Sequence, residues 1–470
     1  MSRIEEPPSS ARPFLILLGP LVAGFVGLFS EAALNVVLPD FMTLFRVSAA
    51  TVQWLTTGYL LVVGVLLPMS SLLVRWFTTR QLVFTVLGCF LVGAVVSAVA
   101  VDFPMLIVGR LIQGIATGIL VPLIFSTAIA AFPPRRRGSA LGLVGLVLMF
   151  APAISPVLAG LILEIADWRW IFWLMIPLIA VSFAVSVLFL RNVREITRPH
   201  VDVISIVLST IGFGLIVFGV SSAGDAGWGS PTVIVALAVG VAALVLFTHR
   251  QLRLSEPVLD VRAFAHRNYA LSASMIFVVG AMLMCTIYLI PMYLEQGLAL
   301  TALLAGLIML PGGVVNGAVS VWAGHAADVH RPWMLARLGF AAAILGGAVL
   351  LFVGQRTPVW VLIVAHCILM IGVPLAMTSA QTFGLNDLPR ELGADGSTII
   401  STLQQVGGAI GTAVGASLLT AGRHLAAGTG PAATVTGTRL GFLFTLIAAA
   451  AGLVLALLLR GRPAAESTGL

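Results

Sequence analysis

The chain contains no lysine, only three cysteines and few charged residues of any kind. Of its 470 residues, 59% are hydrophobic and 9% are charged, whereas a soluble domain carries about 25% charged residues. This shortage of charge excludes an ordinary soluble protein and indicates an integral membrane protein. All 25 basic residues are arginine, and the net charge is +7. Because basic residues gather in the cytoplasmic loops of membrane proteins, this charge does not imply a nucleic-acid partner, and we expect none.

Several motifs of enzymes and metal proteins are also missing. The cysteines, Cys89, Cys285 and Cys367, each lie in an apolar run, which argues against structural disulfides and a thiolate metal site. The chain has no P-loop, no HExxH motif and no CxxC motif. A second intramembrane acid or a Ser/His/Asp set for an intramembrane enzyme is not visible either. We therefore expect no enzyme activity, no metal and no cofactor.

Long apolar runs dominate what is present. Runs of about 19 residues or more occur fourteen times, and each is long enough to cross a ~30 Å hydrocarbon layer as a helix. The pattern predicts an all-α polytopic membrane protein with 14 transmembrane helices. The expected spans are 14–38, 54–74, 81–101, 104–131, 139–163, 170–190, 203–221, 231–249, 270–294, 301–323, 334–353, 358–382, 397–420 and 439–459.

Arginine is distributed unevenly between the two sets of loops. An even number of spans places both termini on one side, and the loops and tails of that side hold 19 arginines, against 5 on the other side. By the positive-inside rule, both termini are expected to be cytoplasmic.

Two polar links, Arg191–Asp202 and His249–Asn268, bracket the seventh and eighth spans. The chain therefore divides into an N-terminal six-helix bundle (1–191), two linker helices with a cytoplasmic loop (192–268) and a C-terminal six-helix bundle (269–470). A pair of six-helix halves is typical of transporters built from parallel repeats. We expect such a transporter.

One carboxylate lies deep in the first apolar run. Glu31 has Asn35 four residues further on, and therefore on the same helical face. A charge within a bilayer is costly, so it normally faces a bundle interior or a watery cavity and marks an ion or substrate path. No other acidic residue lies well inside an apolar span, which makes Glu31 the candidate proton carrier.

The span 104–131 carries the interior cation. Arg110, Gln113 and Thr117 fall on one helical face, and Gly114 and Gly118 form a small-residue edge. At ~1.5 Å per residue, Arg110 and Glu31 both lie ~10 Å below the outer surface. Three interpretations are open: two independent snorkelling residues, a structural ion pair, or a functional pair in a cavity. We favour the last because buried charges need partners and cluster at functional sites.

Other candidates are soft or polar residues in later spans. Met and aromatic side chains suit a promiscuous apolar pocket and equally suit ordinary packing, whereas His366 is either a proton relay or a polar residue in a helix interface. Small residues and prolines spaced by four indicate helix seams, either static or sliding between the halves. The additional cavity candidates are Met282, Tyr288, His366 and Met370, and the seam candidates are Pro152, Ser155, Pro156, Gly407 and Gly411.

Seven stretches together resemble the 14-helix drug:proton antiporters of the major facilitator superfamily. Within them, the chain looks most like the lincomycin-resistance type of bacterial multidrug exporter. The stretches that carry the resemblance are Glu31–Pro39, Val52–Val62, Arg110–Gly118, Ala151–Gly160, Pro291–Leu294, Leu310–Gly317 and Gln404–Gly411.

The resemblance implies two six-helix bundles around a cavity lined by helices 1, 4, 9 and 12, with helices 2, 5, 10 and 13 at the seams. It implies a monomeric, multi-pass protein of the bacterial cytoplasmic (inner) membrane. Its partners would be protons and small lipophilic or cationic compounds, and the proton gradient would drive efflux by alternating access. The alternatives are a dedicated exporter or importer of one metabolite, and a non-transporting membrane sensor or assembly partner.

Two positions depart from the family pattern. After the second span, Arg75 stands where the family has Asp, whereas the second copy of this gating loop keeps Gly324 and Asp328. The fifth span has Ser155–Pro156 where the antiporter motif normally has Gly-Pro.

Overall fold

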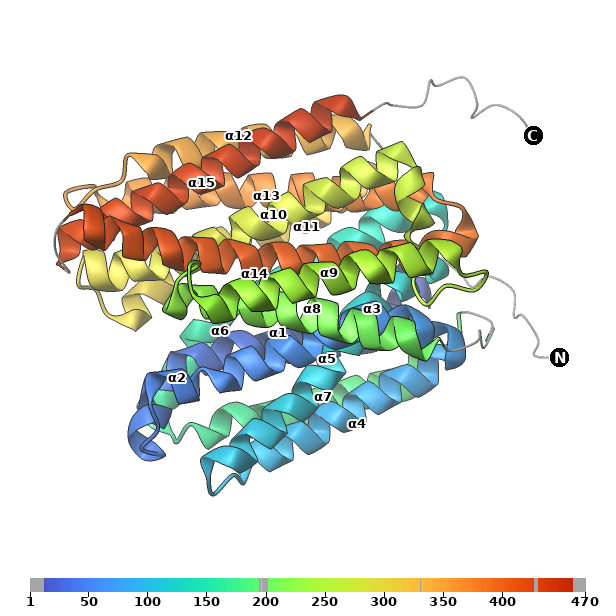
Figure 1. The fold of residues 1–470 in the computed structure, drawn as a ribbon, viewed down its shortest axis with the longest axis horizontal. Helices are drawn as coiled ribbons and strands as arrows, with labels where there is room; N and C mark the ends of the chain where they lie inside the picture. Colours follow the sequence, from blue (N-terminus) through green and yellow to red (C-terminus); the bar gives the residue numbers. More distant parts are fainter. Residues whose placement is uncertain (1–11, 194–195, 197–201, 330, 427–429, 460–470) are drawn as a thin grey trace. The chain divides into compact units, whose positions relative to one another are not determined.

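The computed structural model describes residues 12–193, 196, 202–329, 331–426 and 430–459, and within them all regular structure is helical (Figure 1). The long helices are α1 (Arg12–Leu44), α3 (Trp54–Trp76), α4 (Thr79–Ala98), α5 (Phe103–Ala131), α6 (Arg137–Ile165), α7 (Arg169–Phe189), α8 (Val203–Ala226), α9 (Pro231–Arg253), α10 (Arg267–Met292), α11 (Ala302–Val329), α12 (Pro332–Leu351), α13 (Val359–Asp387), α14 (Gly393–Leu425) and α15 (Pro431–Leu458). The short elements are α2 (Ala49–Val52), η1 (Pro134–Arg136), η2 (Val261–Ala265), η3 (Tyr293–Gly297) and η4 (Arg390–Leu392).

Each expected apolar run coincides with one long helix, and 13 helices of the described chain are long and apolar enough to cross a membrane. The exception is α14, which contains the expected span 397–420 but is not among the 13. Its many Gly, Ser, Thr and Gln residues lower its hydropathy. Helix α15 begins at Pro431, earlier than predicted, because proline is well suited to the first position of a helix. Arg439, expected in a loop, therefore lies within α15.

Side-chain caps fix the start of several helices. The Asp102 carboxylate accepts a hydrogen bond from the backbone N–H of Met105 (2.9 Å) at the start of α5. At α4, Thr78 and Gln81 form a reciprocal capping box. Such caps satisfy N–H groups that have no partner within the helix. They explain why these helices begin at the ends of the apolar runs.

The described chain divides into two compact units. The first comprises residues 1–134, 146–261 and 300–313, and the second comprises 135–145, 262–299 and 314–470. Helices α8 and α9 belong to the first unit, where they pair with each other beside α3 (Figure 1). At this contact the rings of Trp54 and Phe218 stack with centroids 6.3 Å apart. The boundaries expected near residues 191 and 268 stay a prediction.

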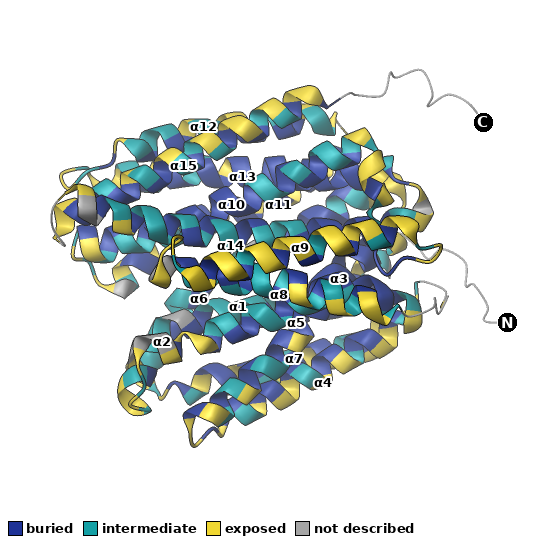
Figure 2. Ribbon diagram, in the orientation of Figure 1, coloured by how far each residue is buried: buried dark blue, intermediate teal, exposed yellow. Residues whose placement is uncertain are grey.

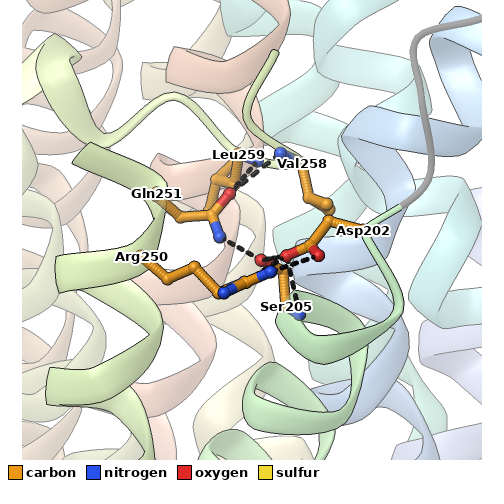
Figure 3. A network of polar contacts seen from close by, with 6 residues as sticks. All are labelled: Asp202, Ser205, Arg250, Gln251, Val258 and Leu259. Carbon is orange, nitrogen blue, oxygen red and sulfur yellow. Dashed lines mark hydrogen bonds and ion pairs between the residues drawn. The ribbon is translucent and has the colours of Figure 1, made fainter. Parts of the chain in front are cut away.

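A polar network joins α8, α9 and the chain that follows α9 (Figure 3). Arg250 donates from Nε and Nη2 to the two carboxylate oxygens of Asp202 (2.6 and 2.8 Å). Gln251 donates to Ser205 Oγ (2.6 Å), which itself donates to Asp202. The hydrogen bonds from Arg250, reinforced by those from Ser205, hold the pKa of the Asp202 carboxyl well below its usual range. The network therefore depends on an ionised Asp202.

Residues 254–260, called the strap here, extend this network to α3. The Gln251 amide oxygen accepts hydrogen bonds from the backbone N–H groups of Val258 (2.8 Å) and Leu259 (3.3 Å). From α3, Ser71 Oγ donates to the Val258 carbonyl (2.7 Å), and Arg75 donates to the Pro257 carbonyl (3.4 Å). Because an ionised aspartate cannot donate to a carbonyl, Arg75 makes a contact that an aspartate at this position could not make.

Exposed residues lie along many helices (Figure 2), and many of them are large and apolar. On α9, for example, Ile234 and Val245 are more than half exposed, as is Trp360 on α13. Large exposed apolar surfaces mark contact with another apolar phase. Together with the candidate spans, they identify the surface that faces lipid.

Candidate functional site

Arg110 on α5 lies at the centre of a buried polar cluster in the first unit. Its side chain is 1% exposed, and its Nη1 donates to Ser30 Oγ of α1 and to Gln113 Oε1, both at 2.8 Å. The guanidinium carbon lies 4.3 Å from the centre of the Tyr59 ring on α3. A cation over an aromatic face is attracted by the ring quadrupole. Three helices therefore hold this charge.

Neutral hydrogen bonds tie the rest of the cluster together. The Tyr59 hydroxyl donates to Thr117 Oγ1 (2.7 Å) and lies 3.4 Å from the Gly27 carbonyl. Ser30 Oγ donates to Gln113 Oε1 (3.2 Å). We call Ser30, Glu31, Tyr59, Arg110, Gln113 and Thr117 the α5 cluster.

Close backbone approach makes the α5 cluster compact. A Cβ atom at Gly114 would lie 3.0 Å from the Tyr59 carbonyl, and one at Gly118 would lie 2.8 Å from Leu66 Cβ. The small-residue edge expected on this helix therefore packs against α3. At Gly27 a Cβ would lie 3.0 Å from Thr117 Oγ1 and 2.8 Å from the Phe90 ring, so glycine is needed to bring α1 near α5.

Glu31 forms no direct ion pair with Arg110, although both belong to described parts of the first unit. The two charges interact through space, but the direct hydrogen bond to Arg110 comes from Ser30, the residue before Glu31. One residue corresponds to ~100° around a helix, which turns the Glu31 carboxylate aside. Its Oε2 is buried without a hydrogen-bond partner, as is Nη2 of Arg110. The sequence predicted that Glu31 and Arg110 lie at the same depth, but it did not predict how α1 is rotated about its axis.

The α5 cluster has the chemistry of a proton site. A buried carboxylate without a hydrogen bond to Oε2 gains from protonation, and a fixed positive charge close by opposes that protonation. Nothing in the described residues gathers three His, Cys, Asp or Glu side chains into a metal site. A carboxylate in this position can take up and release a proton beside a fixed guanidinium.

The remaining cavity candidates lie in the second unit, apart from Asn35, whose side chain is outside the described part. His366 on α13 is 4% exposed, and its Nδ1 has no hydrogen-bond partner. Asn316 on α11 donates to the Met370 sulfur (3.4 Å). Met282 on α10 is fully buried and Tyr288 is half-buried. The structure thus gives Met370, a predicted cavity residue, a polar partner on α11.

Gly324 and Asp328, which were predicted to take part in gating, contact the start of α6 in the second unit. The Asp328 carboxylate accepts hydrogen bonds from the backbone N–H groups of Gly138 (2.6 Å) and Ser139 (2.7 Å) and from the Ser139 hydroxyl. An anion at a helix N-terminus is stabilised by the unpaired N–H groups and the helix dipole. Gly324 allows the close approach, because a Cβ there would lie 2.8 Å from Gly142 Cα.

The seam candidates on α14 lie in close contact with α10, whereas the role of the α6 candidates stays a prediction. A Cβ at Gly407 or Gly411 on α14 would collide with the carbonyl of Phe277 or Ala281 on α10. On α6, Ser155 Oγ donates to the Ala151 carbonyl one turn earlier, and Pro152 and Pro156 lie inside the same helix. Close packing within the second unit therefore accounts for the α14 glycines.

Sequence reasoning left three residues out of the predicted site. Ser30 and Tyr59 complete the α5 cluster; the available signal was that a tyrosine hydroxyl within a membrane needs a hydrogen-bond partner. Asp395 in the first turn of α14 is fully buried. It escaped notice because it lies just before the expected span 397–420.

Comparisons with known proteins agree on one family. A family model described as Major Facilitator Superfamily matches residues 21–412. The lincomycin resistance protein LmrB of Listeria monocytogenes serovar 1/2a is 45% identical over 96% of this chain and 97% of its own length. LmrB of Bacillus subtilis is 45% identical over 93% of this chain and 94% of its own.

A more distant relative and a solved structure extend the comparison. The multidrug resistance protein B homolog of Mycobacterium tuberculosis strain H37Rv is 28% identical over 81% of this chain and 71% of its own. The solved structure of the proton:xylose symporter XylE superposes with a TM-score of 0.65 at 13% identity, covering 96% of this chain and 95% of that one. At this identity, the superposition shows the fold alone.

Proposed function

The chain belongs to the Major Facilitator Superfamily, and from this premise we propose that it exports lipophilic, often cationic, drugs or toxic compounds in exchange for protons. Membership makes it a multi-pass transporter rather than an enzyme. Support for drugs as substrates comes from relatives named for lincomycin resistance and multidrug resistance. The proposed setting is the bacterial cytoplasmic membrane, where a proton gradient is available.

The observation that carries proton coupling is the buried, unpartnered Oε2 of Glu31 beside the fixed charge of Arg110. Facing outward, Glu31 takes up a proton, which weakens its attraction to Arg110. Facing inward, Glu31 releases the proton as a cationic compound enters. The cation then balances the negative charge of the Glu31 carboxylate. A proton entering through 100 mV releases about 2.3 kcal/mol, which is available when the exported compound is neutral. Exchange of one proton for a monovalent cation moves no net charge, and the pH gradient then drives it.

The proposed topology has 14 spans, with both termini in the cytoplasm and the protein acting as a monomer. Helix α14 has 33 residues, and at 1.5 Å per residue this length exceeds the ~30 Å of a bilayer core. The excess of arginine in the loops on the terminus side supports the orientation.

We place a cytoplasmic gate at Asp328. Its three hydrogen bonds to Gly138 and Ser139 join the end of α11 to the start of α6, and alternating access would break and remake them. In the first half, the place of the corresponding aspartate is taken by Arg75, which binds the strap. The two gating loops would therefore act differently during the cycle.

The function is tested by a panel of compounds, lincomycin included, in energised inverted vesicles. Vesicles carrying the protein are expected to accumulate at least one compound, and a protonophore should abolish that accumulation. Vesicles carrying Glu31→Gln are the matched control and should behave as the protonophore-treated sample does. Accumulation that a protonophore leaves unchanged would contradict proton coupling.

A further inference from the structure

An open hollow lies at the end of the second unit opposite the C-terminal end of α15. It has a volume of about 680 Å³ and lies between the α12–α13 connection and the first turns of α15. Its polar lining comprises Gln355, Arg356, Thr357, Thr436 and Arg439, and no carboxylate lines it. In the proposed topology this end faces the outside of the cell.

The positive charge in the hollow is unusual for this side of the membrane. The predicted external loops hold 5 of the 25 arginines, and two of these, Arg356 and Arg439, line this one hollow. Within the described residues, neither guanidinium has a carboxylate in ion-pair contact. Arginine is normally concentrated in cytoplasmic loops. The positive-inside rule therefore does not account for these two external arginines, and binding of an anion would.

Hydrogen bonds hold the wall of the hollow rigidly. Arg439 Nε donates to the Val353 carbonyl (2.8 Å), which fixes the stem of this arginine against the connection. The Gly354 carbonyl accepts from the Tyr293 hydroxyl (2.9 Å) and from the Thr357 N–H (3.0 Å). The Gly354 N–H donates in turn to Thr357 Oγ1 (2.8 Å). The loop that carries Arg356 and the side chain of Arg439 on α15 are thus preorganised, which reduces the entropy cost of binding.

A glycine and two helix N-termini add to the fit for an anion. A Cβ at Gly354 would lie 2.9 Å from Arg439 Nη2, so glycine leaves room for the guanidinium to lie along the loop. Helices α13 and α15 both begin at this end, after Pro358 and Gly430. Unpaired N–H groups at helix starts favour negative charge, although they would not define a site without the arginines.

The surroundings favour a ligand from the membrane interface. Phe352 lines the hollow and is 77% exposed, and Trp360, just beyond it on α13, is 66% exposed. Tryptophan is enriched at the headgroup level of a bilayer, which fits the exposed position of Trp360. Arginine recognises phosphate groups bidentately through its planar fork.

We propose that this hollow binds a phosphate-bearing anion, with Arg356 and Arg439 as its ligands. The expected source is the headgroup of an anionic phospholipid in the outer leaflet, and free phosphate is the other source of the same chemistry. The site is separate from the α5 cluster, so it remains testable if the transport proposal fails.

The test is native mass spectrometry of the full chain purified in neutral detergent. The probes are phosphatidylglycerol, phosphatidylcholine and inorganic phosphate, each added separately. The variants are Arg356→Gln, which removes one charge without touching the loop hydrogen bonds above, and the double variant with Arg439→Gln. The matched control is Arg46→Gln, an exposed and predicted external arginine outside the hollow.

Phosphatidylglycerol is expected to bind the wild type better than phosphatidylcholine does. Loss of one charge-assisted contact should weaken its binding about tenfold in Arg356→Gln, and more in the double variant, with no change in Arg46→Gln. If inorganic phosphate alone shows this dependence on Arg356, the site stands and its ligand is a free anion. If Arg356→Gln binds phosphatidylglycerol and inorganic phosphate as tightly as the wild type does, the proposal is overturned.

Discussion

Arg110 is held by neutral groups rather than by a carboxylate. Its partners are Ser30, Gln113 and the face of Tyr59, which keep the guanidinium in place whether Glu31 is charged or not. A guanidinium fixed in this way supplies a constant positive charge at the proposed proton site. Glu31 is then free to change its protonation state without releasing Arg110.

The two roles of Tyr59 can be separated by two substitutions. Tyr59→Phe removes the hydrogen bond to Thr117 but keeps the ring beneath Arg110, and should lower the free energy of unfolding by about 1 kcal/mol. Tyr59→Leu also removes the cation–π contact and should cost about 2 kcal/mol more in this buried position. Denaturation in detergent measures both, and transport should fall much further in Tyr59→Leu. Equal effects of the two variants would contradict a role for the ring.

The sequence predicted most of the members of the α5 cluster but not the contacts among them. Spacing placed Arg110, Gln113 and Thr117 on one helical face, because side chains three and four residues apart are neighbours on a helix. The direct partner of Arg110 on α1 is Ser30 rather than Glu31, since the rotation of one helix about its axis depends on packing against all its neighbours. No local pattern in the sequence encodes that rotation.

Two glycines of α6 are expected to respond differently to replacement by alanine. A Cβ at Gly142 would lie 2.5 Å from the Ser320 carbonyl, whereas nothing lies within 4 Å of a Cβ at Gly160 on the same helix. Gly142→Ala should therefore destabilise the protein by about 1–3 kcal/mol through overpacking, and Gly160→Ala should be neutral or stabilising. Thermal unfolding of both variants in detergent measures the difference. Equal losses of stability in the two variants would show that crowding against α11 does not cause the effect of Gly142→Ala.

The Asp202–Arg250 pair predicts a pH-dependent stability of the linker helices. Because the folded-state pKa of Asp202 lies below its unfolded value of about 3.9, its contribution is present above that value and is lost as pH falls through the folded pKa. Asp202→Asn should therefore lower the midpoint of thermal unfolding at pH 7.

The difference between wild type and Asp202→Asn should shrink steadily below about pH 4. Ser205→Ala is the control. It leaves the ionisable pair in place, so its loss of stability should depend less on pH than that of Asp202→Asn. A constant difference between wild type and Asp202→Asn from pH 7 to pH 3 would contradict the ion pair as the source of stability.

Apolar runs predicted the helices well because a bilayer leaves few alternatives to helix for a spanning segment. They were less informative where polar residues lie in helix contacts, as in α14, and where a helix extends beyond its apolar part, as at Pro431 in α15. The strap contact was beyond sequence analysis, since Arg75 and Pro257 are separated by 182 residues.

For the whole molecule, orientation in the membrane is an early test. The split of 19 to 5 arginines predicts that Ser2 lies inside the cell and that the loop containing Gly428 lies outside. Tags at both positions in intact cells should give labelling at Gly428 only, and permeabilised cells should give both. Labelling at Ser2 alone in intact cells would reverse the topology and place the proposed anion site in the cytoplasm.

Proton release tests most directly whether Glu31 couples transport to the proton gradient. Purified protein is reconstituted into proteoliposomes with an imposed pH gradient, and substrate-induced proton release is recorded for wild type, Glu31→Gln and Glu31→Asp. Glutamine keeps the size and hydrogen bonding of the side chain but cannot titrate, so Glu31→Gln should fold, bind neutral substrates and release no protons. Glu31→Asp should keep partial release with a shifted pH optimum. Wild-type proton release together with wild-type uphill transport in Glu31→Gln would show that Glu31 is not the coupling site.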